Sequence, residues 1–376
     1  MKIKVIFILD TLANAGTENS LLLILPYFSE TIDYKVVYLY PNHHLLEKYN
    51  QANIPTHFLN LKGNYDFING FKKLKKLFQD EKPDLVVSSL LRSNLLTRMV
   101  CKFMKIPLIG TLVSDSYHKD SIKIKSFFVK IKFKFFWGLD SFSSHIPKLY
   151  IANSSSIVST HNISLGIPTS KTKVIYRGRI IPERVWNAEI NDKGNFKFLS
   201  YGRLIPLKGY KELIEAFNEV QKEYPNCSLT IFGEGNYRGK LEQLINQFDL
   251  KNKVSLPGIH HKVTEELYNY NCYVFTSWYE GFSGTLIEAM LAGIPIIASD
   301  IPMNLEAIKA DETALTFPVK NVEFLAKQMI FAIKNPEIVS RLGIKAREEA
   351  INRFDIKKTA KQYEDTLCEL FAEIHR

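Results

Sequence analysis

Paired cysteines and long apolar runs are missing from this sequence of 376 residues. No stretch approaches the ~18–20 consecutive apolar residues that a membrane-spanning helix requires. The four cysteines are scattered and include no C-x-x-C, which argues against a disulfide framework and a structural zinc site. The N-terminal apolar run 3–9 is interrupted by Lys4, is followed by Asp10 and lacks a small-residue cleavage site. We therefore expect a buried first strand rather than a signal peptide, and a cytoplasmic protein.

The composition is that of a globular protein. Charged residues make up 23% of the chain and hydrophobic residues 46%, so neither a disordered nor a fibrous class fits. A chain of this length is too long for one small module and suits two domains of about 150–200 residues each.

Positive charge is concentrated in the first half. Residues 1–185 contain 26 Lys and Arg against 13 Asp and Glu, whereas the remainder contains 23 against 26. This difference suggests that the first half faces an anionic partner. Nucleic acid explains it less well, because no recognition motif accompanies the charge.

The densest basic segment, residues 119–137, is also rich in aromatic residues. Its apolar residues follow the spacing of one helix face, at Ile124, Phe127, Phe128, Ile131 and Phe135. The lysines around them include Lys123, Lys125, Lys130, Lys132 and Lys134. A basic amphipathic helix can lie in a membrane interface, where each lysine near an anionic surface contributes about 1 kcal/mol. The alternatives are a core-packed helix with solvated lysines and, from the alternation at 122–125 and 130–135, a strand.

Short β-rich runs alternate with helical patterns along the chain, which predicts an α/β fold. In the first half the expected strands are 4–9, 34–40, 85–89, 107–113 and 149–152, and the helical patterns include 69–81 and 93–105. In the second half the expected strands are 196–201, 228–232, 253–256, 273–276, 295–298 and 314–317. Strands that are apolar throughout indicate parallel sheets covered on both faces.

The alternation stops at 177–195, a segment with several turn residues, and we expect the domain boundary there. The predicted organisation is a first domain 1–185, a second domain 186–354 and a C-terminal helix 355–376 that crosses back to pack on the first domain. The helical pattern of 336–376 has an expected break at 354–355. Two such domains facing each other would form a deep cleft, with ligands at the carboxyl ends of the strands.

Two of the loops after expected strands contain residues suited to binding anions. The loop 13–19 contains Gly16, which allows a ligand to approach the backbone at the start of a helix, although an ordinary strand-to-helix turn explains it as well. The loop 201–209 contains Gly202, Arg203 and Lys208. An arginine and a lysine at a strand end can converge on a diphosphate, whereas an isolated pair of this kind is more often solvated.

The next two loops add glycines and carboxylates. Gly233-x-Gly235 follows a strand and either admits a nucleotide or forms a tight turn. The most informative loop contains Glu280, Gly281, Phe282, Ser283, Gly284 and Thr285, and Glu288 follows on the next helix. Its backbone N–H groups lie at a positive helix end that suits phosphate or sugar oxygens. The two carboxylates can hold different parts of one ligand. The alternative is that Glu280 caps the helix and Glu288 is a surface residue on it.

Together these residues resemble the retaining glycosyltransferases of family 4, which have the GT-B fold of two Rossmann-like domains around a cleft. The resemblance rests on Gly202-Arg203 with Lys208-Gly209, on Gly233-x-Gly235, and on Glu280 and Glu288 separated by seven residues. It covers the whole second domain. In the first domain Gly16-x-Glu18 is similar to the family's glycine loop, with Ala15 in place of the commoner first glycine. The segment 176–179 stands where the family usually has an Asn-Gly pair.

The resemblance implies a role for each of these residues. Arg203 and Lys208 would bind the donor diphosphate and stabilise its charge as it leaves. Glu288 would hold the ribose hydroxyls and Glu280 the transferred sugar, while the N–H groups of 283–285 would bind sugar or phosphate. Gly16 would bring the backbone of the first domain against the diphosphate. No Asp-x-Asp occurs in the chain, so a metal-bridged diphosphate is not implied and no cofactor is expected.

The sequence contains fewer recognisable motifs for the acceptor site than for the donor site. A histidine is common there in the family, and His118 is the candidate, although its distance from the preceding strand is greater than usual and a lone histidine is more often structural. The implied function is transfer of a sugar from a nucleotide sugar, with UDP the commoner carrier, to a glycan or lipid-linked acceptor in cell-surface polysaccharide or glycolipid synthesis. The basic first domain suits peripheral association with the inner face of the membrane. The alternatives are an epimerase or phosphorylase of the same fold and a non-catalytic nucleotide-sugar-binding subunit.

Overall fold

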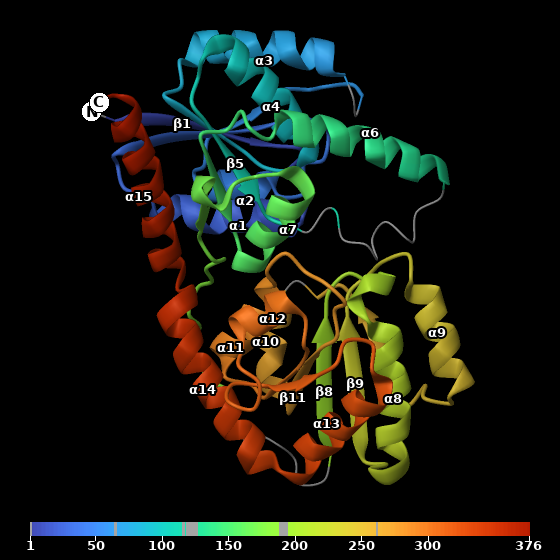
Figure 1. Ribbon diagram of the computed structural model, residues 1–376. Helices are drawn as coiled ribbons and strands as arrows, with labels where there is room; N and C mark the ends of the chain where they lie inside the picture. The colour runs from blue at the N-terminus through green and yellow to red at the C-terminus, as the bar shows by residue number, and fades with distance from the viewer. Residues whose placement is uncertain (1, 64–65, 115–116, 118–126, 188–194, 261) are drawn as a thin grey trace. The chain divides into compact units, whose positions relative to one another are not determined.

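The computed structural model describes residues 2–63, 66–114, 117, 127–187, 195–260 and 262–376. Its contacts divide into two compact units, Met1–Gly178 with Asp355–Arg376, and Arg179–Phe354 (Figure 1). The first unit ends earlier than the residue 185 that we expected. The reason is that Arg179 N donates to Phe354 O (2.8 Å) and Trp186 N donates to Ala292 O (2.8 Å), which attaches this segment to the second unit.

A seven-stranded parallel sheet forms the centre of the first unit, in the order β3-β2-β1-β4-β5-β6-β7. The strands are β1 Ile3–Leu9, β2 Ile32–Tyr38, β3 Thr56–Phe58, β4 Leu85–Ser88, β5 Leu108–Leu112, β6 Leu149–Ala152 and β7 Thr172–Val174. Successive side chains of β1 point to opposite faces, so Val5, Phe7 and Leu9 join one hydrophobic cluster and Ile6 and Ile8 another. Both faces of the sheet are buried, as the continuous apolar runs predict.

Helices cover the two faces of this sheet. They are α1 Gly16–Ile24, α2 Leu46–Gln51, α3 Phe67–Glu81, α4 Leu91–Met104, α6 Phe127–Ser143, α7 Ser155–Leu165 and α15 Ile356–Ile374. Helices α1 and α15 contribute Leu21 and Tyr363 to the Val5 face, whereas α3 and α4 contribute Phe78 and Leu96 to the Ile6 face. The α6 segment is a helix, so the alternative prediction of a strand within 130–135 is wrong.

The second unit contains a six-stranded parallel sheet in the order β10-β9-β8-β11-β12-β13. Its strands are β8 Phe196–Tyr201, β9 Cys227–Phe232, β10 Val254–Gly258, β11 Cys272–Phe275, β12 Ile296–Ser299 and β13 Leu315–Phe317. Its helices are α8 Tyr210–Glu223, α9 Arg238–Gln247, α10 Val263–Glu266, α11 Gly284–Ala292, α12 Pro302–Ala307, α13 Val322–Lys334 and α14 Pro336–Phe354. Leu213, Phe217 and Val220 lie on one side of α8 and join the core. The predicted α/β class with two parallel, Rossmann-like sheets is confirmed.

The helical pattern of the C-terminal segment breaks where we predicted. Helix α14 ends at Phe354 and α15 begins at Ile356, with Asp355 between them. The Asp355 side chain accepts a hydrogen bond from Lys357 N (3.0 Å) and so caps α15. Helix α15 belongs to the first unit, where Tyr363 packs against Phe7 with ring centroids 6.3 Å apart. Within the described part of the chain, no helix combines the length and apolar character needed to cross a bilayer.

Candidate functional site

The glycines after β8 and β9 bring two loops of the second unit into direct contact. Gly202 N donates to Phe232 O (3.0 Å) and Leu204 N donates to Glu234 O (2.9 Å). A Cβ atom at Gly233 would overlap the carbonyl oxygen of Gly202, and φ of Gly233 is +140°, a conformation that other residues rarely adopt. The Gly233-x-Gly235 pattern therefore has a packing role that accounts for its first glycine without a ligand.

A short turn fixes Lys208 beside β11. Gly209 ends the turn Pro206–Lys208 in the left-handed conformation with φ +68°, and a side chain there would meet the backbone of Thr276. The Thr276 hydroxyl donates to Lys208 O (2.8 Å), which attaches the turn to the strand end. The Lys208 ammonium group forms an ion pair with Glu280, and both side chains are mostly buried, with exposed fractions of 17% and 18%. The structure thus joins two of the predicted site residues.

Arg203 differs from Lys208. Its side chain is exposed, and it makes no hydrogen bond or ion pair with the residues that the structure describes. The two predicted cations therefore lie in different environments, one held by a carboxylate and one in solvent.

Helix α11 begins in the glycine-rich turn that follows β11. Ser283 caps the helix, because its hydroxyl accepts from Leu286 N (3.4 Å), and it also contacts the Thr285 hydroxyl (3.0 Å). Phe282 is 1% exposed and packs against Phe354, with ring centroids 5.5 Å apart. Ser283 and Phe282 therefore shape the turn.

Glu288 is held by two residues that sequence reasoning did not assign to the site. Arg179 Nε donates to Glu288 Oε1 (2.7 Å), and the Tyr201 hydroxyl donates to Oε2 (3.0 Å). Burial, followed by the negative charge of Glu288, raises the pKa of Tyr201 well above its usual range, so the hydroxyl keeps its proton. Arg179 lies in the segment 176–179, and the unusual sequence of this segment was the only indication that Arg179 could belong to the site. Tyr201 ends the predicted strand 196–201, which gave no indication of a polar role.

Gly16 of the first unit starts α1 and lies beside Arg177. A Cβ atom on Gly16 would come within 2.9 Å of Arg177 Nη1, and Arg177 Nη2 donates to Val113 O (3.4 Å). Glu18, two residues further along α1, is 3% exposed. Burial raises the pKa of the Glu18 carboxyl, with a further contribution from Asp10, while Arg177 opposes the shift.

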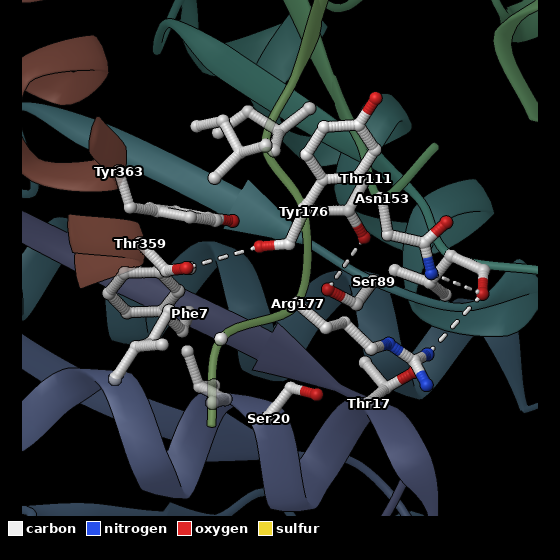
Figure 2. A pocket seen from close by; sticks show the side chains of 16 residues that line it. Phe7, Thr17, Ser20, Ser89, Thr111, Asn153, Tyr176, Arg177, Thr359 and Tyr363 are labelled. Carbon is white, nitrogen blue, oxygen red and sulfur yellow. Dashed lines mark hydrogen bonds between the residues drawn. The ribbon is translucent and has the colours of Figure 1, made fainter. Parts of the chain in front are cut away.

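A pocket opens beside Arg177, wholly within the first unit (Figure 2). It is a small cavity of about 80 Å³ between the sheet, α1 and α15. Its walls are largely apolar, and its polar residues include Thr17, Ser89, Thr111 and Asn153. Thr111 Oγ1 donates to Ser89 Oγ (2.8 Å) and Asn153 Nδ2 donates to Val113 O (2.9 Å), whereas the buried Asn153 Oδ1 has no partner among the described residues.

The remaining predicted residues lie in or near the basic segment. His118, Lys123 and Lys125 are outside the described residues. Lys130, Lys132 and Lys134 lie on α6, where Lys132 and Lys134 are exposed.

A known family model matches a segment of the chain that lies mostly in the second unit. Residues 165–349 match the family model "Glycosyl transferases group 1". This match covers just under half of the chain and supports a relation to the group 1 glycosyltransferase superfamily. An uncharacterized glycosyltransferase of Methanocaldococcus jannaschii is 41% identical over 108 residues, which are 29% of this chain and 27% of that protein. The O-antigen biosynthesis glycosyltransferase WclY of Escherichia coli is 27% identical over 217 residues, covering 55% of this chain and 58% of WclY.

Solved structures resemble the chain over nearly its whole length. Anabaena HepE in complex with UDP-glucose has a TM-score of 0.83 at 20% identity, with 98% of this chain and 100% of that chain covered. Staphylococcus aureus TarM has a TM-score of 0.79 at 13% identity, with 99% of each chain covered. These likenesses establish that the group 1 domain is part of a GT-B fold.

Proposed function

We propose that this protein is a retaining, family 4 glycosyltransferase that moves a hexose from a nucleotide sugar to a glycan or lipid-linked acceptor. The ion pair of Lys208 with Glu280 carries the proposal, because it joins a cation for the leaving diphosphate to a carboxylate for the sugar hydroxyls. A positioned cation stabilises negative charge that develops on the leaving group. UDP is the favoured carrier, in line with the structural likeness to HepE bound to UDP-glucose. We propose transfer without a metal ion, with Arg203 and Lys208 neutralising the diphosphate.

We place the acceptor in the pocket of the first unit (Figure 2). Its unpartnered Asn153 Oδ1 can accept a hydrogen bond from an acceptor hydroxyl, and Arg177 supplies positive charge. The apolar walls suit a sugar face or the first part of a lipid. Relatives whose names specify an acceptor, such as a poly(ribitol-phosphate) alpha-N-acetylglucosaminyltransferase of Staphylococcus aureus, support a cell-surface polymer or glycolipid as the product class.

Thermal melting with nucleotides tests the donor site directly. UDP, GDP and ADP, and their sugar conjugates, are added in the presence of EDTA to the wild type and to Glu288→Ala. The control is Glu323→Ala, which changes an exposed side chain of α13. A ligand that binds the folded state raises the melting temperature by mass action. We expect a rise of a few degrees with one nucleotide family, lost only in Glu288→Ala. A product with a new glycosidic bond distinguishes transfer from epimerisation and from binding without catalysis, and no shift with any nucleotide contradicts the proposal.

We also propose that α6 associates with an anionic membrane surface. Ile131, Phe135 and Phe142 are exposed by 53%, 63% and 77%. Lys132 and Lys134 on the same helix add charge complementary to anionic lipids. Trp137 Nε1 donates to Ser164 O (2.8 Å), so α6 is attached to the neighbouring α7 while this apolar surface remains exposed.

Vesicle flotation tests the membrane proposal. The wild type is expected to float with vesicles rich in phosphatidylglycerol at low salt, and to dissociate at high salt because exposed charges are then screened. The triple variant Ile131→Ser/Phe135→Ser/Phe142→Ser should not float. The control Ile344→Ser, which changes an exposed residue of α14, should float like the wild type. A wild type that stays at the bottom of the gradient, or a triple variant that floats, contradicts this proposal.

A further inference from the structure

Arg179 occupies a defined place at the start of α11, although none of the roles above requires it. Its side chain is 12% exposed, and its Nε donates to Glu288 Oε1 at 2.7 Å. The guanidinium group also lies against Gly284, the first residue of α11. A Cβ atom on Gly284 would come within 2.6 Å of Arg179 Cζ. The guanidinium can lie there only because residue 284 has no side chain.

The backbone gives no other reason for a glycine at this position. Gly284 is not among the glycines with positive φ, and alanine is favoured over glycine in a helix. The space taken by the Arg179 guanidinium therefore explains the residue type at 284.

The placement of Arg179 is electrostatically unfavourable without Glu288. The N-terminus of a helix carries partial positive charge, which repels a cation. Glu288 compensates, because its carboxylate lies on the same helix and accepts the Arg179 hydrogen bond. Tyr201 engages the other oxygen, so each carboxylate oxygen has one fixed donor. An ionised carboxylate has about four lone-pair sites, which leaves acceptor capacity on both oxygens.

We propose that Arg179 is a positioning residue of the donor site, which together with Tyr201 orients Glu288 so that its remaining lone pairs accept from the ribose hydroxyls. This proposal rests on the proposed function, in which Glu288 holds the ribose. The rigid, planar guanidinium fixes the orientation of the Glu288 carboxylate through its hydrogen bond to Oε1. The ligand group recognised is the ribose diol of a nucleoside diphosphate.

The preference for ribose over 2′-deoxyribose is the quantity that this proposal predicts. Calorimetric titration gives the dissociation constants of UDP and GDP and of their 2′-deoxy forms. A hydrogen bond to a charged group corresponds to a preference of about tenfold or more. We expect the wild type to have such a preference, and Glu288→Ala, Arg179→Met and Gly284→Ala to reduce it to about threefold or less.

Two matched controls separate this role from general effects of the substitutions. Arg341→Met removes an exposed arginine of α14, and Gly239→Ala adds a methyl group in α9 where no atom lies within 4 Å. Both should keep the wild-type preference. Gly284→Ala keeps every hydrogen-bonding group of the site and removes only the space for Arg179, so it remains informative if Arg179→Met fails to fold.

The outcomes distinguish the two proposals. If Glu288→Ala loses the preference while Arg179→Met and Gly284→Ala keep it, the role of Arg179 is overturned and the donor site stands. The role of Arg179 is likewise overturned if Arg179→Met lowers the melting temperature but keeps the preference for ribose, since Arg179 is then only structural. If the wild type binds no nucleoside diphosphate, or if Glu288→Ala keeps the preference, the proposed function itself is overturned.

Discussion

The Lys208 ammonium group forms an ion pair with Glu280, a residue 72 positions later in the chain. The pair lies where the loop after β8 meets the loop after β11, and solvent reaches less than a fifth of either side chain. In the proposed reaction, a cation held in this place stabilises the departing diphosphate without the reorganisation that a solvated lysine would need.

Removing this cation should affect catalysis far more than folding. We expect Lys208→Met to lower kcat/KM for sugar transfer by about 10²–10³-fold, in the range found when a preorganised electrostatic group is lost. Initial rates of nucleotide release measure the effect. Lys211→Met, which removes an exposed lysine of α8, should leave the rate within about twofold of the wild type. A Lys208→Met variant with unchanged kcat/KM would remove Lys208 from the catalytic machinery.

The contact between the loops after β8 and β9 predicts that two glycine-to-alanine substitutions differ in their effect on the free energy of unfolding. Gly233→Ala combines φ +140° with overlap on the carbonyl of Gly202, and we expect it to lower the free energy of unfolding by at least about 2 kcal/mol. Gly239→Ala lies in α9 with open space around it, and we expect it to be neutral or to stabilise by up to about 1 kcal/mol. Urea unfolding measures both. Equal effects of the two substitutions would contradict the packing role of Gly233.

The buried Glu18 carboxyl predicts the pH dependence of one substitution. Burial raises its pKa in the folded state above the ordinary value of 4.5, so ionisation favours unfolding. Stability contributed by the protonated group is present below pH 4.5 and is lost as pH rises through the folded-state pKa. Relative to the wild type, Glu18→Gln should therefore gain stability as pH rises through this window and then reach a plateau. Urea unfolding across pH 4–8 measures the difference.

The exposed Glu47 of α2 provides the control for Glu18. Glu47→Gln should follow the wild-type pH profile. A Glu18→Gln difference that is constant with pH, or that shrinks as pH rises, would mean that burial does not perturb this carboxyl.

A buried ion pair in the first unit gives a prediction about stability alone. Arg98 is 1% exposed, and its guanidinium bonds Asp140, the Ser143 hydroxyl (3.0 Å) and the Tyr150 hydroxyl (3.1 Å). Arg98→Met leaves Asp140 buried without its cation, and we expect a loss of about 3–5 kcal/mol. The double variant Arg98→Met/Asp140→Leu should recover part of that loss, because no uncompensated charge remains. A double variant less stable than Arg98→Met would contradict this account and would mean that Asp140 stabilises the fold through another contact, such as the hydrogen bond that the Tyr117 hydroxyl donates to it.

The sequence predicted most strands because buried parallel strands are apolar throughout. Strand β1 was expected at 4–9 and spans Ile3–Leu9, and β8 was expected at 196–201 and spans Phe196–Tyr201. Strand β3 was missed, since Thr56–Phe58 has only three residues and no face of it is fully buried. Helix α6 remained ambiguous, because its lysines and aromatic residues alternate over several positions and solvent contacts much of its surface.

The sequence predicted several residues of the site but not the contacts between them. Glu280, Glu288 and Lys208 were identified from local motifs, but the ion pair between Lys208 and Glu280 depends on parallel strands that bring distant loops together. Arg179 was noted only as unusual, because its partner Glu288 lies 109 residues further along the chain and no local spacing relates them. Contacts of this kind come from the topology of the sheet.

The interruption of the first unit by the second constrains the order in which the chain can fold during synthesis. Ile356, Tyr363 and Leu367 of α15 belong to the same hydrophobic cluster as Val5 and Phe7, but the ribosome produces them after the whole of Arg179–Phe354. The nascent first unit therefore carries an incompletely covered sheet face until residues 355–376 have been made. The second unit is continuous in sequence and has all of its residues available earlier. Thus a helix that is made after the whole second unit completes the hydrophobic core of the first.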